Sequence, residues 1–266
     1  MTKTTLLALF YVMLFVLSCK KESDDRYSRL KQINYRTTAA GIGDKIDVTF
    51  DYDAQGRVVS LNTHLIRNVF FNNTQFEQLS TTTVMYNANG RFEKSTYTLN
   101  SKPQYFYTYY YNTKGQVTKK LHTKLHASAQ AEDHAYTYDN QGRLIADSVY
   151  DSFNHVYRYS TYTYDGADNI VVYGGAQRDQ WGGGFVLYGE GYAKYDNKRN
   201  PHSLLDRNYS TILTAPCSKN NVVEGGSVNG SSKSFYENTY LPNGLLKKSL
   251  SQNGPDDIRE VSYEYE

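Results

Sequence analysis

Closely spaced histidines and regularly recurring aspartates are the residues of this chain whose types could do chemistry. His122 and His126 lie four apart, and imidazole nitrogens are common zinc ligands. In an extended strand that spacing is wide for two ligands of one ion, so solvated histidines are favoured. Asp53, Asp139 and Asp165 could serve as acid–base carboxylates or as calcium ligands. Each stands at the same place in a repeat, however, which favours turn residues.

Sequence motifs of known reactions are absent from the chain. It has no G-x-S-x-G, H-E-x-x-H, P-loop, C-x-x-C or EF-hand pattern. Its 29 basic and 27 acidic residues are spread without blocks, which excludes the electrostatic footprint of a nucleic-acid-binding protein. We therefore expect no catalytic residues, no cofactor, no metal site and no nucleic-acid partner. The expected protein is not an enzyme.

The aspartates belong to a motif that recurs along most of the chain. Two aromatic or apolar residues two apart precede Asp or Asn, and then come Gly and Arg; the best copy, at residues 136–143, reads YTYDNQGR. Good copies also begin at Phe50, Val84 and Tyr109. Later copies are degenerate: the one after Tyr164 has Asp168 in place of Gly, and the one after Tyr195 has Arg199 there.

The spacing Asp-x-x-Gly between extended segments predicts a β-hairpin built on a type I turn. The Asp side chain can accept a hydrogen bond from the backbone N–H two residues on. The glycine takes the left-handed conformation of a G1 bulge, which a residue with a Cβ adopts at a cost. The glycines predicted to hold these structural turns are Gly56, Gly90, Gly115, Gly142 and Gly244.

Stacked hairpins of this kind must form a large sheet, because a lone hairpin is marginally stable in water. Strand side chains alternate, so the tyrosines two apart share one face and polar residues the other. Roughly 14–16 strands are implied, and open twisted sheets rarely exceed about 10. We predict an all-β antiparallel meander curled into a large barrel or an incomplete roll. Its mean hydropathy of −0.66 and polar second face favour a barrel that does not span a membrane.

The N-terminus has the pattern of a secretory signal peptide. Lys3 supplies a positive start, an apolar run extends from Leu6 to Leu17, and Ser18 is a small residue before Cys19. Residues 16–19, VLSC, resemble a bacterial lipobox, in which the cysteine becomes the lipid-modified first residue. An ordinary signal peptide followed by a chance cysteine is the alternative.

The expected division of the chain is a signal peptide over 1–18, a lipidated cysteine with a polar tether over 19–29, and a β-repeat domain over 30–266. The acidic end of the tether, KKESDD, resembles the export signal of Bacteroidota-type lipoproteins, and a plain solvated linker is the alternative. We expect a membrane partner through the lipid anchor, at the outer membrane. The anchored protein would lie at the cell surface or on the periplasmic face.

Two segments interrupt the repeat and are predicted to be loops. One runs from Gly174 to Gly191 and contains Arg178, Asp179 and Trp181; the other covers 201–234. Long loops on a rigid scaffold often hold binding sites, and the sole tryptophan is suited to stacking on a sugar. A hairpin tip with Trp181 folded back as a core plug is the alternative. The candidate ligand contacts are Trp181, Arg178 and Asp179.

The YxYDxxGR copies resemble the YD repeats of Rhs and teneurin-type proteins, in which long β-sheet arrays wrap into shells. A lipobox followed by a few such repeats is also similar to uncharacterised Bacteroidota lipoproteins with a porin-like β fold. The resemblance implies an accessory envelope protein and transfers no catalytic residue. Two hypotheses follow: a non-catalytic cell-envelope lipoprotein with a structural role or another envelope protein as partner, or a surface lipoprotein that binds a glycan or small ligand through residues 174–191.

Overall fold

Short turns that begin with Asp or Asn divide the chain into antiparallel strands. The computed structural model describes residues 29–39, 42–69, 74–126, 132–151, 153–178, 184–187, 189–205, 218–254 and 257–266. No helix of these residues is long and apolar enough to cross a membrane. Residues 1–28 lie outside this part, and with them the predicted signal peptide and Cys19.

The elements, in chain order, have the following bounds. The first eight strands are β1 (Leu30–Ala39), β2 (Ile42–Tyr52), β3 (Val58–Val69), β4 (Thr74–Tyr86), β5 (Phe92–Leu99), β6 (Lys102–Tyr111), β7 (Val117–Lys124) and β8 (Asp133–Tyr138). The others are β9 (Leu144–Tyr150), β10 (Val156–Tyr164), β11 (Ile170–Arg178), β12 (Phe185–Leu187), β13 (Gly191–Arg199), the 3-10 helix η1 (Pro201–Leu204), β14 (Asn220–Ser227), β15 (Lys233–Tyr240), β16 (Leu246–Gly254) and β17 (Asp257–Tyr265).

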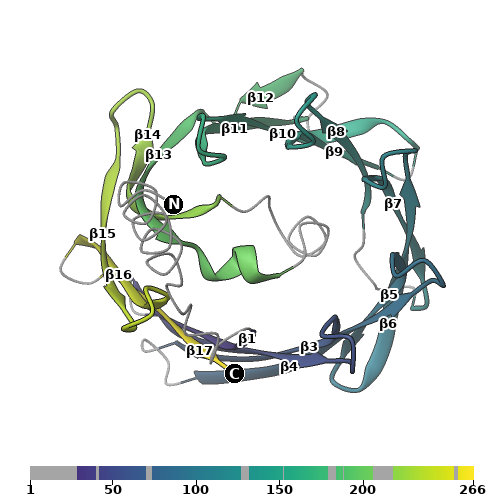
Figure 1. Ribbon diagram of the computed structural model, residues 1–266, viewed down its shortest axis with the longest axis horizontal. Helices are drawn as coiled ribbons and strands as arrows, with labels where there is room; N and C mark the ends of the chain where they lie inside the picture. The colour runs from purple at the N-terminus through teal and green to yellow at the C-terminus, as the bar shows by residue number, and fades with distance from the viewer. Residues whose placement is uncertain are drawn as a thin grey trace, which may run out of the picture.

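The strands form one closed barrel with meander topology (Figure 1). Neighbouring strands pair antiparallel around the ring, and β1 pairs with both β2 and β17, which closes it. Of the 17 strands in the described part of the chain, 16 make the ring, because β12 pairs with β11 alone. The prediction of an all-β antiparallel barrel is confirmed, and the barrel is closed.

The turn of each good repeat has the geometry that its spacing predicts. In the first turn, Asp53 Oδ1 accepts backbone N–H bonds from Gln55 at 3.0 Å and from Arg57 at 2.8 Å. The register shifts by one residue beside Tyr52, which is the bulge. The φ angles of the turn glycines are +78° at Gly56, +72° at Gly90, +81° at Gly115, +82° at Gly142 and +84° at Gly244.

The tyrosine before most turns fastens its hairpin to the preceding one; Tyr240 bonds the Asp196 carboxylate instead. Tyr86, for example, donates its hydroxyl to the backbone carbonyl of Val58, 2.7 Å away. The same bond recurs from Tyr52, Tyr111, Tyr138, Tyr164, Tyr195 and Tyr265 to Leu30, Phe92, Val117, Leu144, Ile170 and Leu246, respectively. Phenylalanine cannot make this bond, which explains the preference for tyrosine on a buried face. Burial raises the pKa of Tyr52 to about 12.

The arginine after each turn adds a second link between hairpins. The guanidinium carbon of Arg57 lies 4.3 Å from the ring centroid of Tyr86 in the next hairpin. Arg91 and Arg143 make the corresponding contacts with Tyr111 and Tyr164. A cation over an aromatic face is attracted by the ring quadrupole. The wall is therefore held together by a tyrosine bond and an arginine contact repeated from one hairpin to the next.

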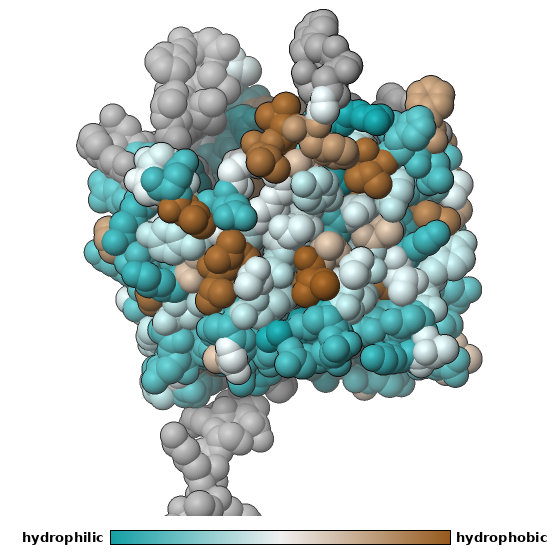
Figure 2. Space-filling view, turned by 90° about the horizontal axis from the view of Figure 1, so that it is seen from above, coloured by the Kyte–Doolittle hydropathy of each residue, from teal (hydrophilic) through white to brown (hydrophobic). Residues whose placement is uncertain are grey.

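The inner and outer faces of the wall differ in composition. The buried core lies inside, where Leu30, Ile33, Phe50, Val84 and Tyr109 are 7% exposed or less. On the outer face the strands are joined by ion pairs, such as Lys194–Glu224 at 3.0 Å and Lys248–Glu260 at 2.5 Å. Figure 2 shows hydrophilic side chains along one rim of the face it displays, with hydrophobic ones gathered toward the other rim.

The prediction that residues 174–191 and 201–234 are loops is wrong in part. Gly174 and Gly175 belong to β11 and pair with β10, and the residues from Asn220 on form β14 and the start of β15. A Cβ at Gly175 would overlap the carbonyl oxygen of Tyr159. The glycine is therefore required by the close approach of two strands, and it does not mark a loop there.

Candidate functional site

After β13 the chain leaves the wall and enters the lumen. Figure 1 shows η1 inside the ring. Asn200 caps this helix by accepting a hydrogen bond from the backbone N–H of His202 at 2.9 Å, and Pro201 stands at its first turn. The His202 ring packs edge-on against Tyr263, with centroids 6.0 Å apart, and Leu205 joins the buried core. These contacts hold the luminal segment in place.

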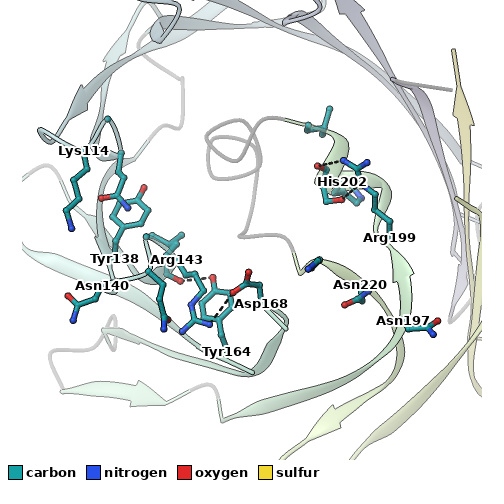
Figure 3. Close-up of a pocket in the computed structure, with 18 residues that line it drawn as sticks. Lys114, Tyr138, Asn140, Arg143, Tyr164, Asp168, Asn197, Arg199, His202 and Asn220 are labelled. Atoms are coloured by element: carbon teal, nitrogen blue, oxygen red, sulfur yellow. Dashed lines mark hydrogen bonds and ion pairs between the residues drawn. The ribbon is translucent and has the colours of Figure 1, made fainter. Parts of the chain in front are cut away.

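A cavity of about 880 Å³ lies between this luminal segment and the barrel wall (Figure 3). On the wall side it is lined by the β6–β7 turn, the β8–β9 turn and the residues beside them: Lys114, Gly115, Gln116, Tyr138, Asn140, Gln141, Gly142, Arg143, Leu144, Tyr164 and Asp168. On the luminal side it is lined by Asn197, Arg199, His202, Ser203, Leu205, Lys219 and Asn220.

Arg143 is the fixed cation of the wall side. Its Nε donates to Asp139 Oδ2 at 2.7 Å, its Nη1 lies 3.4 Å from Asp168 Oδ1, and its guanidinium carbon lies 4.8 Å from the Tyr164 ring centroid. Desolvation tends to raise the pKa of Asp139, but the backbone N–H and the guanidinium of Arg143 outweigh it and lower that pKa. The positive charge of Arg143 is thus neutralised by neighbouring carboxylates.

The luminal side presents Arg199 and a neutral histidine. Arg199 Nε donates to Ser203 Oγ at 3.1 Å, so its contact within the segment is to a hydroxyl. Burial lowers the pKa of His202 below its ordinary value, which keeps the imidazole uncharged near neutral pH. The backbone N–H of Asn220 donates to Asn169 Oδ1 at 2.9 Å and ties this side to β11.

Several polar side chains of the cavity are left for a ligand. Lys114, Asn140, Asn197 and Lys219 are exposed, and within the described residues their side chains make no hydrogen bond or ion pair. They come from both sides of the cavity. In the part of the lining that the structure describes, there are many donors and a single carboxylate, Asp168, which already contacts Arg143. This composition suits binding a polar ligand better than transferring protons.

The residues predicted from sequence as ligand contacts lie elsewhere or are not described. Arg178 ends β11, is exposed and does not line the cavity. Asp179 and Trp181 lie outside the described residues. His122 bonds Asp133, with 2.7 Å between Nδ1 and Oδ1, and does not meet His126 in a common cluster. Among the described residues no group of three or more His, Cys, Asp or Glu could hold a metal ion.

The cavity residues were missed, although the sequence holds a signal for them. Two degenerate repeats replace the turn glycine, one with Asp168 and one with Arg199, and both replacements line the cavity. Asp168 adopts a left-handed φ of +66°, which is uncommon for a residue with a Cβ. A repeat in which another residue replaces the turn glycine is therefore a signal in the sequence for a residue with a role in binding.

The inner wall also buries a lysine away from the cavity. Lys120 on β7 is 7% exposed, and its ammonium lies 4.4 Å from the ring centroid of Tyr107. Burial lowers the pKa of Lys120 to about 8. Beside it, His134 Nδ1 lies 2.9 Å from Asp147 Oδ1.

No family model matches the chain, and no curated protein matches it. A solved structure of a porin-like protein from Bacteroides uniformis ATCC 8492 is similar at 15% identity, covering 90% of this chain and 98% of that chain with a TM-score of 0.60. The TcdB2-TccC3-Cdc42 and TcdB2-TccC3-TEV structures match 84% and 85% of this chain at 13% identity, but the matches span 14% of those chains, with TM-scores of 0.35 and 0.33. The first likeness shows the fold, which is a porin-like β-barrel.

Proposed function

We propose that this protein is a non-catalytic cell-envelope lipoprotein that binds a short oligosaccharide or a similar polar ligand in the luminal cavity. The observation that supports this function is a set of donors on the two sides of the cavity, Lys114 and Asn140 opposite Asn197 and Lys219, that make no side-chain hydrogen bond or ion pair with any described residue. In the same turns the first residue, Asn112 or Asp139, is bonded by the backbone N–H groups of its own turn.

The size and chemistry of the cavity fit such a ligand. About 880 Å³ is within the range of roughly 300–1,000 Å³ usual for ligand pockets. Amide and ammonium donors match the hydroxyl oxygens of a sugar, and the rings of Tyr138 and Tyr164 add apolar surface to the wall side.

A non-catalytic role is supported by the state of the ionisable groups. Asp139 and Asp165 are engaged by the backbone N–H groups of their own turns, and Asp168 lies beside Arg143. His202 is buried and neutral. A general acid or base needs a free titratable group within reach of the reacting atom, and the described cavity residues do not supply a matched pair.

The cellular address belongs to the same proposal. The sequence before the barrel supports a lipid anchor at Cys19 and a place on the outer membrane, at its surface or periplasmic face. The water-facing ion pairs of the outer wall, such as Arg36–Asp47 at 2.9 Å, support a tethered barrel. The repeated tyrosine, turn and arginine links likewise support membership of the YD-repeat class.

Ligand binding can be tested with a pair of matched variants. Asn140 and Ala54 occupy the same place in two turns, and only Asn140 lines the cavity. Asn140→Trp should fill the cavity and weaken oligosaccharide binding at least tenfold, about 1.4 kcal/mol. Ala54→Trp should leave the affinity unchanged. Calorimetry of the purified full-length lipoprotein in detergent with an oligosaccharide panel measures both, and equal effects of the two variants would refute this location.

The lipid anchor has its own test. Cells expressing the protein are labelled with a clickable fatty-acid analogue, and the purified chain is probed for label. We expect label on the wild type and none on Cys19→Ser. Equal labelling of the two would rule out Cys19 as the lipid site.

A second candidate function is a protein-interaction role, favoured by the exposed hydrophobic residues of β12. Phe185, Val186 and Leu187 are 44%, 57% and 74% exposed. Among the described strands β12 pairs only with β11, and Phe185 contacts the Tyr159 ring at 5.5 Å between centroids. An apolar strand with an unpaired edge is a surface that other chains can bind. A pull-down that captures a partner with the wild type and loses it with Leu187→Lys would support this role.

A further inference from the structure

We infer that the ligand of the luminal cavity is an anionic oligosaccharide, one that bears carboxylate or sulfate groups. The inference rests on the proposed binding function and adds the charge of the ligand to it. Its basis is the imbalance of charge among the described residues that line the cavity: four cationic side chains, Lys114, Arg143, Arg199 and Lys219, and a single carboxylate, Asp168.

The imbalance persists after the internal ion pairs are taken into account. Arg143 is neutralised by Asp139 and Asp168. That leaves Lys114, Arg199 and Lys219, for which the described residues provide no carboxylate within ion-pair distance. His202 is held neutral by burial, so it does not offset or add to this charge near neutral pH.

Several other cations of the barrel are paired with carboxylates. Arg67 is paired with Asp44 at 2.7 Å inside the wall, and Glu224 is shared by Lys194 and Lys233 outside it. The turns show the same contrast. Two good turns pair Asp with Arg, whereas the turn that bears Lys114 begins with Asn112 and ends in Gln116, both uncharged.

The positions of the free cations define where an anion would sit. Figure 3 places Lys114 on the wall side of the cavity and Arg199 on its luminal side, where the guanidinium lies beside Ser203. An anion bound in the cavity would be attracted by cations on both of its sides. The exposed amides of Asn140 and Asn197 supply neutral donors for sugar hydroxyls beside the charged groups.

The enclosure of the site limits the class of anion. A cavity of about 880 Å³ between the wall and the luminal segment admits a few sugar units but has no room for a nucleic-acid duplex or a folded partner. Carboxylate and sulfate groups are both recognised by Lys and Arg through charge-assisted hydrogen bonds. Either group makes the ligand an acidic sugar, which is the class that we infer.

The test is calorimetry of the full-length lipoprotein in detergent with three probes of similar length: trigalacturonic acid, a chondroitin sulfate tetrasaccharide and neutral maltotriose. We expect at least one acidic probe to bind about tenfold or more tightly than maltotriose, and its affinity to fall as salt rises from about 0.05 to 0.5 M. Binding of trigalacturonic acid alone assigns a carboxylate ligand, and binding of the sulfated probe alone assigns a sulfate ester.

Matched lysine variants test the residues. Lys114→Gln and Lys219→Gln should each weaken the acidic probe about threefold to tenfold, with little effect on maltotriose. Lys119→Gln is the control, because Lys119 is exposed on β7 and does not line the cavity. Equal affinity for acidic and neutral probes would overturn the charge inference and leave the binding function standing. Absence of binding by all three probes would overturn both.

Discussion

The wall from β2 to β9 and the segment from the β10–β11 turn to β14 arise from the same repeat, yet they differ in the residues that stand at its turn positions. In the wall, Asp53 accepts hydrogen bonds from the backbone of its own turn, and the guanidinium of Arg57 lies over the ring of Tyr86 in the next hairpin. In the later segment, Asp168 and Arg199 stand where glycine is expected, and the chain turns inward at η1. The comparison teaches that a regular repeat uses its first turn residue and its arginine for contacts within the wall, whereas the luminal side of the cavity forms where the repeat is broken; the regular turns that bear Lys114 and Asn140 supply the wall side.

The largest expected effect comes from a turn glycine of the wall. Gly142→Val places a β-branched residue at a φ of +82° and should lower the free energy of unfolding by about 1–3 kcal/mol. Gly166→Ala in the broken turn is the control, because Gly166 has no positive φ and a Cβ there meets nothing within 4 Å. Denaturant midpoints that rank the two variants in the reverse order would contradict the hairpin account.

A smaller effect is expected from the tyrosine bonds. Tyr86→Phe removes the hydroxyl that reaches Val58 and should cost about 1 kcal/mol, the typical net value of one hydrogen bond. Tyr110, 47% exposed on the outer face, gives the control Tyr110→Phe, which should change stability by a few tenths of a kcal/mol at most. Equal costs would show that the hydroxyl bond does not couple the hairpins.

The smallest effect is a change in pH dependence. The folded pKa of Asp139 is lowered, so its contribution to stability is present above its ordinary pKa of about 3.9 and is lost as pH falls through the lower folded value. Asn87 accepts the same two backbone bonds in another turn without a charge. Asp139→Asn should therefore keep most of the stability at pH 7 and flatten its decline below about pH 4. If Asp139→Asn loses stability at acid pH as steeply as the wild type does, Asp139 does not contribute to the pH dependence as we predict.

The sequence predicts the local parts of this fold better than the long-range ones. Hairpin turns such as Asp53 to Gly56 follow from spacing and backbone sterics alone, and stacked hairpins with too many strands for an open sheet predict a curled barrel. Closure depends on pairing between β1 and β17, about 230 residues apart, which no local pattern encodes. The entry of η1 into the lumen depends on where Leu205 and His202 find packing partners, which is decided only once the barrel exists.

The cavity could not be located from the sequence for the same reason. A lone tryptophan among glycines is conspicuous in a sequence, and Trp181, which lies outside the described residues, stays a candidate; the cavity is assembled from turns and a luminal segment far apart in the chain. Lys114 and Lys219 are unremarkable in sequence and meet only through the curvature of the wall. The replacement of the turn glycine by Asp168 and by Arg199 is visible in the sequence. That both residues line one cavity is not.

Hydrogen–deuterium exchange with and without a saturating acidic oligosaccharide tests the central claim most directly, because it locates the ligand without prior choice of a residue. We predict slowed exchange in residues 112–116, 139–143 and 197–205, which come from both sides of the cavity. The turn at 53–57, which does not line the cavity, should be unaffected and serves as the internal control. Protection confined to residues 174–191, around Trp181, would contradict the cavity account and restore the loop as the binding site.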